Sequence, residues 1–251
     1  IAIFCGLFFY FASPAQAADW YLRAAAGYES SRSADFSDDN CGSTNPPALF
    51  GCGPGIDGRP LGAYGDFGSF GAFDAALGRN VLPWLRTDLS VSWRPNMVYS
   101  GKSNFLGVPG EQPVYSTASA LTAMLNVFVD IPNPAGGPLS RLKPYLGGGV
   151  GLSRNSLDEM SYLFPGLTVH KISITPSGRS FHFAYTFSFG TGIVISERVS
   201  LDIAYRWSHL GRVETDAGRM YMNHVPQGIG IAGTSARLQA HGLQMGLRYS
   251  F

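Results

Sequence analysis

The chain has 251 residues, which fits one domain or one barrel with large loops. Its formal net charge is +1, so the chain as a whole offers no electrostatic surface for nucleic acid. Charged residues make up only 14% of the chain and aromatic residues 13%, with 32 glycines. This composition suits an apolar wall that faces lipid, although a glycine-rich soluble β protein has a similar one.

The first 17 residues have the pattern of a secretory signal peptide. Residues 1–11 are almost wholly apolar, and Ala15-Gln16-Ala17 follows as an Ala-x-Ala cleavage pattern. We interpret residues 1–17 as a signal peptide truncated at its start, because Met and a basic segment are missing. The run is too short to span a bilayer as a helix, and no later stretch approaches 18 uninterrupted apolar residues. We therefore expect residues 18–251 to form an exported domain without a membrane-spanning helix.

Two cysteines remain after the expected cleavage, since Cys5 lies in the signal segment. Cys41 and Cys52 are an even count in an oxidising compartment, so we predict a disulfide between them that closes a short loop. The alternative is a pair of free thiols.

Eight segments alternate between apolar and polar residues, as expected of strands with one lipid-facing and one lumen-facing side. In residues 84–99, Leu85, Leu89 and Val91 share one face, while Arg86 and Asp88 lie on the other. The glycines at 147–149 and 151 suit a small barrel with large lumen side chains. The predicted strands are residues 20–29, 61–78, 84–99, 114–131, 141–153, 181–195, 199–209 and 236–251.

The connections between these segments are alternately long and short. Long ones cover residues 30–60, 100–113, 154–180 and 210–235, whereas short ones cover 79–83, 132–140 and 196–198. Outer-membrane barrels have long extracellular loops and short periplasmic turns in this order. We therefore predict an all-β, eight-stranded antiparallel transmembrane β-barrel over residues 18–251, with both ends on the periplasmic side.

Charged residues on the inward faces are the strongest candidates for a functional role. They are mixed in sign, and buried charges persist where they are paired. We expect ion pairs that plug the lumen of an eight-stranded barrel, which side chains can just fill. The alternative is a water-filled path lined by charge. The predicted lumen charges are Arg23, Arg86, Asp88, Arg94, Lys143, Asp202, Arg206 and Arg248.

Aromatic residues near the segment ends suit the girdles at the two membrane interfaces. This set comprises Trp20, Trp84, Tyr99, Tyr115, Tyr185, Trp207 and Tyr249.

Three stretches, residues 143–151, 201–207 and 241–251, resemble small opacity-type or OmpA-transmembrane-like surface proteins of the porin family. The final alternation Leu247, Tyr249, Phe251 resembles the terminal signature of outer-membrane barrels. The resemblance implies a place in the bacterial outer membrane, with Phe251 as the signal read by the barrel-assembly machinery. It is specific for the barrel and not for a function, because members of this family differ in role.

An enzymatic reading has weak support. Outer-membrane lipid A deacylases use a His-Ser pair with an acidic partner, His coming first and Ser two residues later. Here Ser208-His209 has the reverse order, with Glu214 just beyond, and adjacent strand residues face opposite sides. We found no spacing typical of a metal or phosphate site, so we predict no cofactor.

The leading hypothesis is a non-enzymatic surface barrel that serves membrane integrity or contact through its extracellular loops. A small channel for ions or solutes is the second hypothesis, and a lipid A-modifying enzyme is a remote third. The expected partners are outer-membrane lipid and lipopolysaccharide, the assembly machinery, and a host or environmental ligand at the loops, with no nucleic acid.

Overall fold

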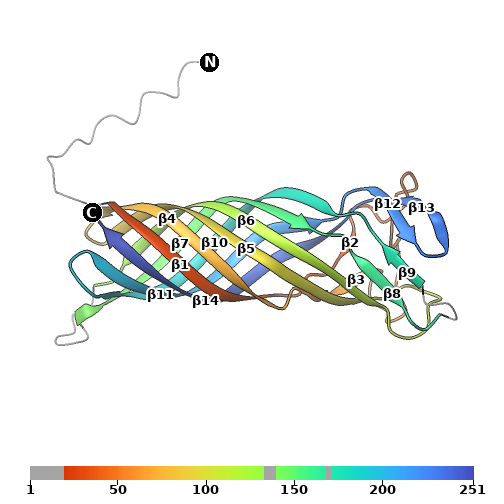
Figure 1. Ribbon diagram of the computed structural model, residues 1–251, viewed down its shortest axis with the longest axis horizontal. Coiled ribbons are helices and arrows are strands. Elements are labelled where there is room, and N and C mark those ends of the chain that lie inside the picture. The colour runs from red at the N-terminus through yellow and green to blue at the C-terminus, as the bar shows by residue number, and fades with distance from the viewer. Residues whose placement is uncertain (1–19, 133–139, 168–170) are drawn as a thin grey trace, which may run out of the picture.

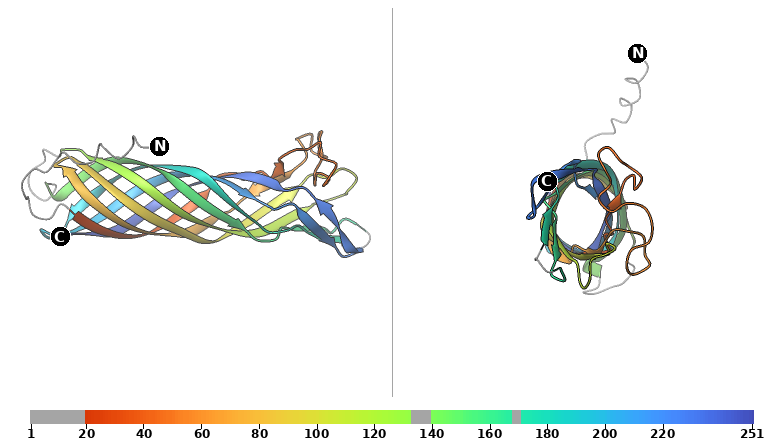
Figure 2. Two further views of the ribbon diagram at one scale, coloured as in Figure 1. Left: turned by 90° about the horizontal axis from the view of Figure 1, so that it is seen from above. Right: turned by 90° about the vertical axis from the view of Figure 1, so that its right-hand side faces the viewer.

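The computed structural model describes residues 20–132, 140–167 and 171–251. The predicted signal peptide and most of the predicted turn at 132–140 lie outside these residues. Eight long strands pair in the order β1-β4-β5-β6-β7-β10-β11-β14, and β14 pairs with β1, so the sheet closes on itself (Figure 1). All of these pairings are antiparallel, and the end-on view shows a closed ring (Figure 2). The predicted eight-stranded barrel is therefore confirmed.

The ring strands are longer than the sequence predicted. A strand needs about 9–11 residues to cross a membrane, whereas several ring strands have 16 or more. The excess extends the barrel beyond the expected membrane band. The ring comprises β1 (Trp20–Ser31), β4 (Ser69–Leu82), β5 (Leu85–Ser103), β6 (Pro113–Asp130), β7 (Leu142–Leu157), β10 (Gly178–Val194), β11 (Val199–Glu214) and β14 (Thr234–Ser250).

The two ends of the barrel differ. At one end, here called the turn end, short connections join β4 to β5 and β10 to β11. The Phe251 amide donates to the Trp20 carbonyl there at 2.9 Å, so both ends of the described chain meet at the turn end. The other end, the loop end, carries the long connections, as predicted (Figure 1). No helix in the described residues is long and apolar enough to cross a membrane.

Three of the four predicted loops, residues 30–60, 154–180 and 210–235, contain short strands, which corrects the sequence analysis. They contain five short strands: β2 (Ser37–Asp38), β8 (Ser161–Phe164), β9 (Lys171–Ile174), β12 (Gly218–Met222) and β13 (Val225–Ile231). The strand predicted at residues 61–78 is divided into β3 (Ala63–Asp66) and β4, which starts at Ser69. The order β13-β12-β9-β8-β6 makes a flap that continues the wall above β6 (Figure 1). The peptide groups of these segments form backbone hydrogen bonds in the sheet. The polar composition of the segments had not predicted strands there.

The outer wall carries the apolar side of the alternation. On β10, for example, Phe181, Phe183, Phe187 and Phe189 point outward and Ala184 inward, as predicted. Period-two alternation places these rings on one face of the strand. The wall therefore has the apolar surface that a lipid environment requires.

Three irregularities reverse the alternation near the loop end. β5 changes register between Arg94 and Met97, where Asn96 has φ 50°, and β11 changes between His209 and Arg212. The chain also turns at Gly68 (φ 58°), between β3 and β4. A bulge inserts an unpaired residue, so every later side chain changes face.

Two side-chain predictions are wrong for this reason. Tyr99, expected in an interfacial girdle, is fully buried in the barrel interior. Unbroken alternation over the predicted strand 61–78 would place Phe67 outward with Phe73 and Asp66 inward with Asp74, but Phe67 is buried and Asp66 is exposed. Both residues follow or adjoin a reversal of the alternation, which hydrophobic periodicity alone does not reveal.

The glycines of β7 make room for large side chains in the lumen. A Cβ at Gly147 would overlap the Phe128 ring, and one at Gly149 would overlap the Asn126 amide. The missing side chains on β7 thus let β6 fill the interior, as the sequence analysis expected.

Candidate functional site

The lumen contains a group of buried charges centred on Glu29 of β1. Its carboxylate accepts from Arg94 of β5 at 2.7 Å and from Arg206 of β11 at 2.9 Å. Glu29 and Arg94 are 2% and 1% exposed. Since β5 and β11 lie two strands from β1 on either side, this carboxylate ties three parts of the ring together.

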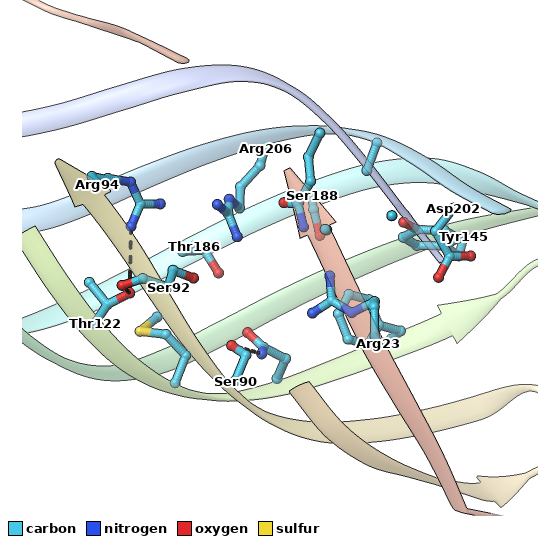
Figure 3. A pocket seen from close by; sticks show the side chains of 17 residues that line it. Arg23, Ser90, Ser92, Arg94, Thr122, Tyr145, Thr186, Ser188, Asp202 and Arg206 are labelled. Carbon is cyan, nitrogen blue, oxygen red and sulfur yellow. Dashed lines mark hydrogen bonds between the residues drawn. The ribbon is translucent and has the colours of Figure 1, made fainter. Parts of the chain in front are cut away.

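A second group lies nearer the turn end, around Arg23. Its guanidinium is 3.0 Å from Asp74 and 3.3 Å from Asp88. Asp74 also pairs with Arg206 at 3.3 Å, which links this group to Glu29. Asn126 donates to Asp88 at 2.6 Å. Figure 3 shows Arg23, Arg94 and Arg206 projecting into the same space from three strands.

Two further ion pairs complete the inward charges. Arg86 pairs with Asp130 at 2.7 Å, and its guanidinium lies over the Tyr145 ring at 4.9 Å. Arg248 pairs with Asp202 at 3.1 Å. Stacking on an aromatic face suits the planar guanidinium and limits the cost of taking it out of water.

The positive and negative charges paired in the lumen are equal in number. Five arginines, Arg23, Arg86, Arg94, Arg206 and Arg248, face five carboxylates, Glu29, Asp74, Asp88, Asp130 and Asp202. Each is held by a partner from another strand, as buried charge requires. We call these ten residues the lumen network. The space left between them is about 30 Å³, room for about two water molecules.

Seven of the eight predicted lumen charges lie in this network, and Lys143 does not. Lys143 is exposed and makes no ion pair with a described residue. The predicted set also omitted Glu29, Asp74 and Asp130. The sequence did indicate that acidic residues were missing from this set. The predicted set had six basic residues and only two acidic ones, and charges buried in a small lumen need partners of opposite sign.

An apolar core fills the barrel above the network, toward the loop end. Tyr99, Met97, Leu157, Tyr162 and Leu210 are all 2% exposed or less. Met97 and Leu210 follow or lie at the bulges described above, so the same irregularities that reverse the alternation turn apolar side chains inward. The sequence analysis missed this second filling, which we call the upper core.

The first long connection folds into the upper core. Phe36 packs edge-on against Tyr99 at 5.1 Å between ring centroids, and Phe50 stacks on Phe105 at 5.3 Å. The disulfide between Cys41 and Cys52 is present, as predicted. It closes the segment that carries Phe50, which limits the conformations that this segment can adopt.

Asp38 fixes the same segment by accepting hydrogen bonds from three backbone amides. Its carboxylate oxygens lie 2.8, 3.0 and 2.8 Å from the amides of Leu49, Phe50 and Gly51. Nearby, a hydrogen bond from the Asn104 side chain lowers the pKa of the exposed Asp57. In the flap, burial raises the pKa of the Tyr162 phenol. The loop end is thus held by specific polar contacts as well as by apolar packing.

The candidate catalytic residues do not come together. Ser208 is buried in the lumen 3.5 Å from Arg94, whereas the His209 ring lies on the outer wall against Tyr185. Glu214 bonds instead to His182, at 2.8 Å. No cluster of metal-ligating side chains occurs among the described residues. Phe251, the predicted assembly signal, is half-exposed and stacks on Tyr249 at 6.4 Å.

Comparison with known proteins agrees with this architecture. Residues 2–251 match the family of the outer membrane protein beta-barrel domain. An uncharacterised protein of Brucella melitensis biotype 1 is 30% identical over 93% of this chain and 85% of its own length. One of Brucella suis biovar 1 is 30% identical over 75% of this chain and 72% of its own.

Two solved structures with low sequence identity are similar over most of the chain. Neisserial surface protein A has a TM-score of 0.47 at 15% identity, covering 93% of this chain and 97% of that one. OprG of Pseudomonas aeruginosa has a TM-score of 0.46 at 14% identity, covering 94% and 96%. The family match over nearly the whole chain, together with the closed eight-stranded ring, makes this protein a member of the outer membrane β-barrel domain family of the bacterial outer membrane.

Proposed function

We propose that this protein is a closed, non-enzymatic outer-membrane scaffold that presents folded extracellular loops. In this role it contributes to membrane integrity or to contact with the environment. The observation that carries the proposal is the filling of the lumen at two levels, by the lumen network and by the upper core. A barrel whose lumen is filled at two levels is suited to hold its loops in place at the cell surface, and not to conduct ions or solutes.

The charge balance of the lumen network supports closure. Pores that select ions by charged side chains carry rings of one sign along the wall. Here five arginines are matched by five carboxylates, and Glu29 alone holds two guanidiniums across the lumen. Opening a path would separate these pairs, and water would have to replace their charge-assisted hydrogen bonds.

The upper core supports the loop-presenting role. The first connection is anchored by Phe36 and Phe50, by the disulfide and by Asp38. Side chains that hold a loop in one conformation reduce the ordering cost of binding a ligand there. Extracellular loops on a rigid barrel are the usual place for recognition.

Single-channel recording in planar bilayers tests this proposal. The purified protein is inserted and compared with an open porin, and insertion is checked by the shift in gel migration between unheated and boiled samples. We expect no discrete conductance from the inserted barrel. Steady openings at physiological salt would instead favour the channel hypothesis and make the lumen arginines its selectivity residues.

The non-enzymatic part is tested separately by lipid analysis. Cells expressing the wild type, Ser208→Ala or His209→Ala are compared for the mass of their lipid A. We expect identical lipid A in all three. A loss of acyl chains that depends on either residue would overturn this part of the proposal.

A further inference from the structure

Five arginines lie on the outer wall at the loop end, on adjacent strands. Arg154 is on β7, Arg179 on β10, Arg212 on β11 and Arg237 on β14, and Arg32 directly follows β1. Arg212 and Arg237 are cross-strand partners, and the Arg32 amide donates to the Gln239 carbonyl of β14 at 3.0 Å. We call these five residues the arginine face.

The arginine face lies at the expected height of the outer headgroups. About twelve residues separate Arg32 from Trp20 and Arg237 from Tyr249, or about 30 Å along the barrel axis at the usual rise and tilt. Below it on the same strands, the outer wall is apolar and aromatic, with Tyr28, Leu152, Phe183, Trp207 and Leu243. An apolar band about 25 Å tall thus ends where the arginines begin.

A hollow of about 760 Å³ opens within this face, between residues 32–39 and β14. Arg32, Arg212 and Arg237 line it. Pairing of β14 with the chain after β1 is interrupted here, since Ser31 pairs with Ala240 and the next ladder pair is Ser37 with Ser235. The hollow is therefore formed by a gap in the strand pairing beside β14.

Three carboxylates also line this hollow, those of Asp35, Asp38 and Asp39, and of these Asp39 forms an ion pair with an arginine of the face. Asp38 is held by the amides of the first connection, and Asp39 accepts from Ser235 at 2.6 Å and lies 3.8 Å from Arg212. No carboxylate of the described residues lies within 4.0 Å of Arg32 or Arg237. These two guanidiniums are thus open to an anionic ligand.

Arg154 and Arg179 also have no acidic partner among the described residues. Arg154 packs over the Phe181 ring, and its Nε atom is buried with no hydrogen-bond partner among the described residues. On the opposite wall, β4, β5 and β6 offer Lys102 at a similar height, and this residue is paired with Glu111. At this height, the arginines of the described ring strands that have no acidic partner therefore lie on one side of the barrel.

We propose that the arginine face binds the phosphate groups of lipid A in the outer leaflet. A guanidinium forms two parallel, charge-assisted hydrogen bonds to a phosphate, and several can share one group. The acyl chains of the same lipid would lie along the apolar wall beneath. This continuity between arginines and lipid-facing wall favours a membrane glycolipid over a soluble polyanion.

A lipid-binding titration tests this inference. The purified full-length barrel in detergent is titrated with phosphorylated lipid A and with the same lipid A after enzymatic removal of its phosphates. The double variant Arg32→Gln/Arg237→Gln is compared with Arg198→Gln, which makes the same change at the turn end. Unchanged gel migration before boiling shows that each variant folds.

We expect the wild type and Arg198→Gln to prefer the phosphorylated form by about tenfold, and the double variant to lose this preference. Equal binding of both lipids by the wild type, or a preserved preference in the double variant, would overturn the inference. Inorganic phosphate and a soluble sulfated polysaccharide serve as competitors. Displacement of lipid A by either at an equal phosphate or sulfate concentration would assign the face to soluble anions instead.

Discussion

The lower and upper parts of the lumen are closed by different means. Near the turn end, charges such as Glu29 and Arg206 pair across the barrel, whereas near the loop end Phe36, Tyr99 and Leu210 form an apolar core. The lower part is surrounded by lipid, so its strands need one apolar face outward and can turn polar residues inward. The upper part lies in water, and it is packed like a soluble protein, apolar side inward.

The bulges lie at the boundary between the lower part, where apolar side chains point outward, and the upper part, where they point inward. Each inserts a residue, as at Asn96 of β5 and at Leu210–Gly211 of β11, and thereby exchanges the inner and outer faces. One continuous strand can then satisfy lipid below and water above. The comparison indicates that the bulges position the boundary of the membrane band.

The largest expected effect comes from removing the central carboxylate. Glu29→Gln leaves Arg94 and Arg206 without their shared partner, so we expect the free energy of unfolding to fall by about 3–5 kcal/mol. The measurement is a denaturant titration followed by gel migration. Glu197→Gln, in an exposed turn, is the matched control and should leave the midpoint unchanged. An equally stable Glu29→Gln barrel would contradict a role of the lumen network in holding the lower barrel.

A cavity in the upper core should have a slightly smaller and more local effect. Phe36→Ala removes a buried ring packed on Tyr99, and we expect a loss of about 3 kcal/mol, felt mainly as protease cleavage in the first connection. Phe187→Ala, on the lipid-facing wall, is the control. If cleavage of the two variants were the same, the upper core would not anchor the loops.

The disulfide should contribute less than the packed ring. Cys41→Ser/Cys52→Ser removes a covalent closure 11 residues apart, which is worth about 2 kcal/mol. We expect faster proteolysis between residues 40 and 60 and an unchanged unfolding midpoint of the ring. A shift of the whole barrel's midpoint would show that the loop and the ring unfold together.

The smallest effect is expected for Lys143, which was predicted as a lumen charge but lies outside the observed lumen network. Lys143→Gln should change stability by less than about 0.5 kcal/mol, since Lys143 is exposed and pairs with no described residue. Arg248→Gln, which breaks the pair with Asp202, should cost more. Equal losses in the two variants would place Lys143 in the network after all.

The sequence predicted the lower barrel well because one physical rule governs it. Alternation in residues 84–94 and 199–209 indicated which side chains face lipid, and it placed Arg86, Arg94 and Arg206 inward. The same rule failed above Arg94, since a bulge leaves no clear signal in composition. Glu29, Asp74 and Asp130 could have been predicted as lumen residues, because buried arginines require acidic partners. The strands inside the long connections could not, since β8 joins the sheet through β6, β12 through β9 and β2 through β14, all distant in sequence.

The most direct test of the closed lumen is the labelling of a thiol placed inside the lumen network. Ala204 lines the small cavity of the lumen network and is 7% exposed, so Ala204→Cys is treated with a membrane-impermeant maleimide under non-reducing conditions. Ala217→Cys, on an exposed connection, is the matched control. We predict immediate labelling of Ala217→Cys and labelling of Ala204→Cys only after unfolding. Labelling of Ala204→Cys in the native barrel at a rate close to that of the control would contradict closure.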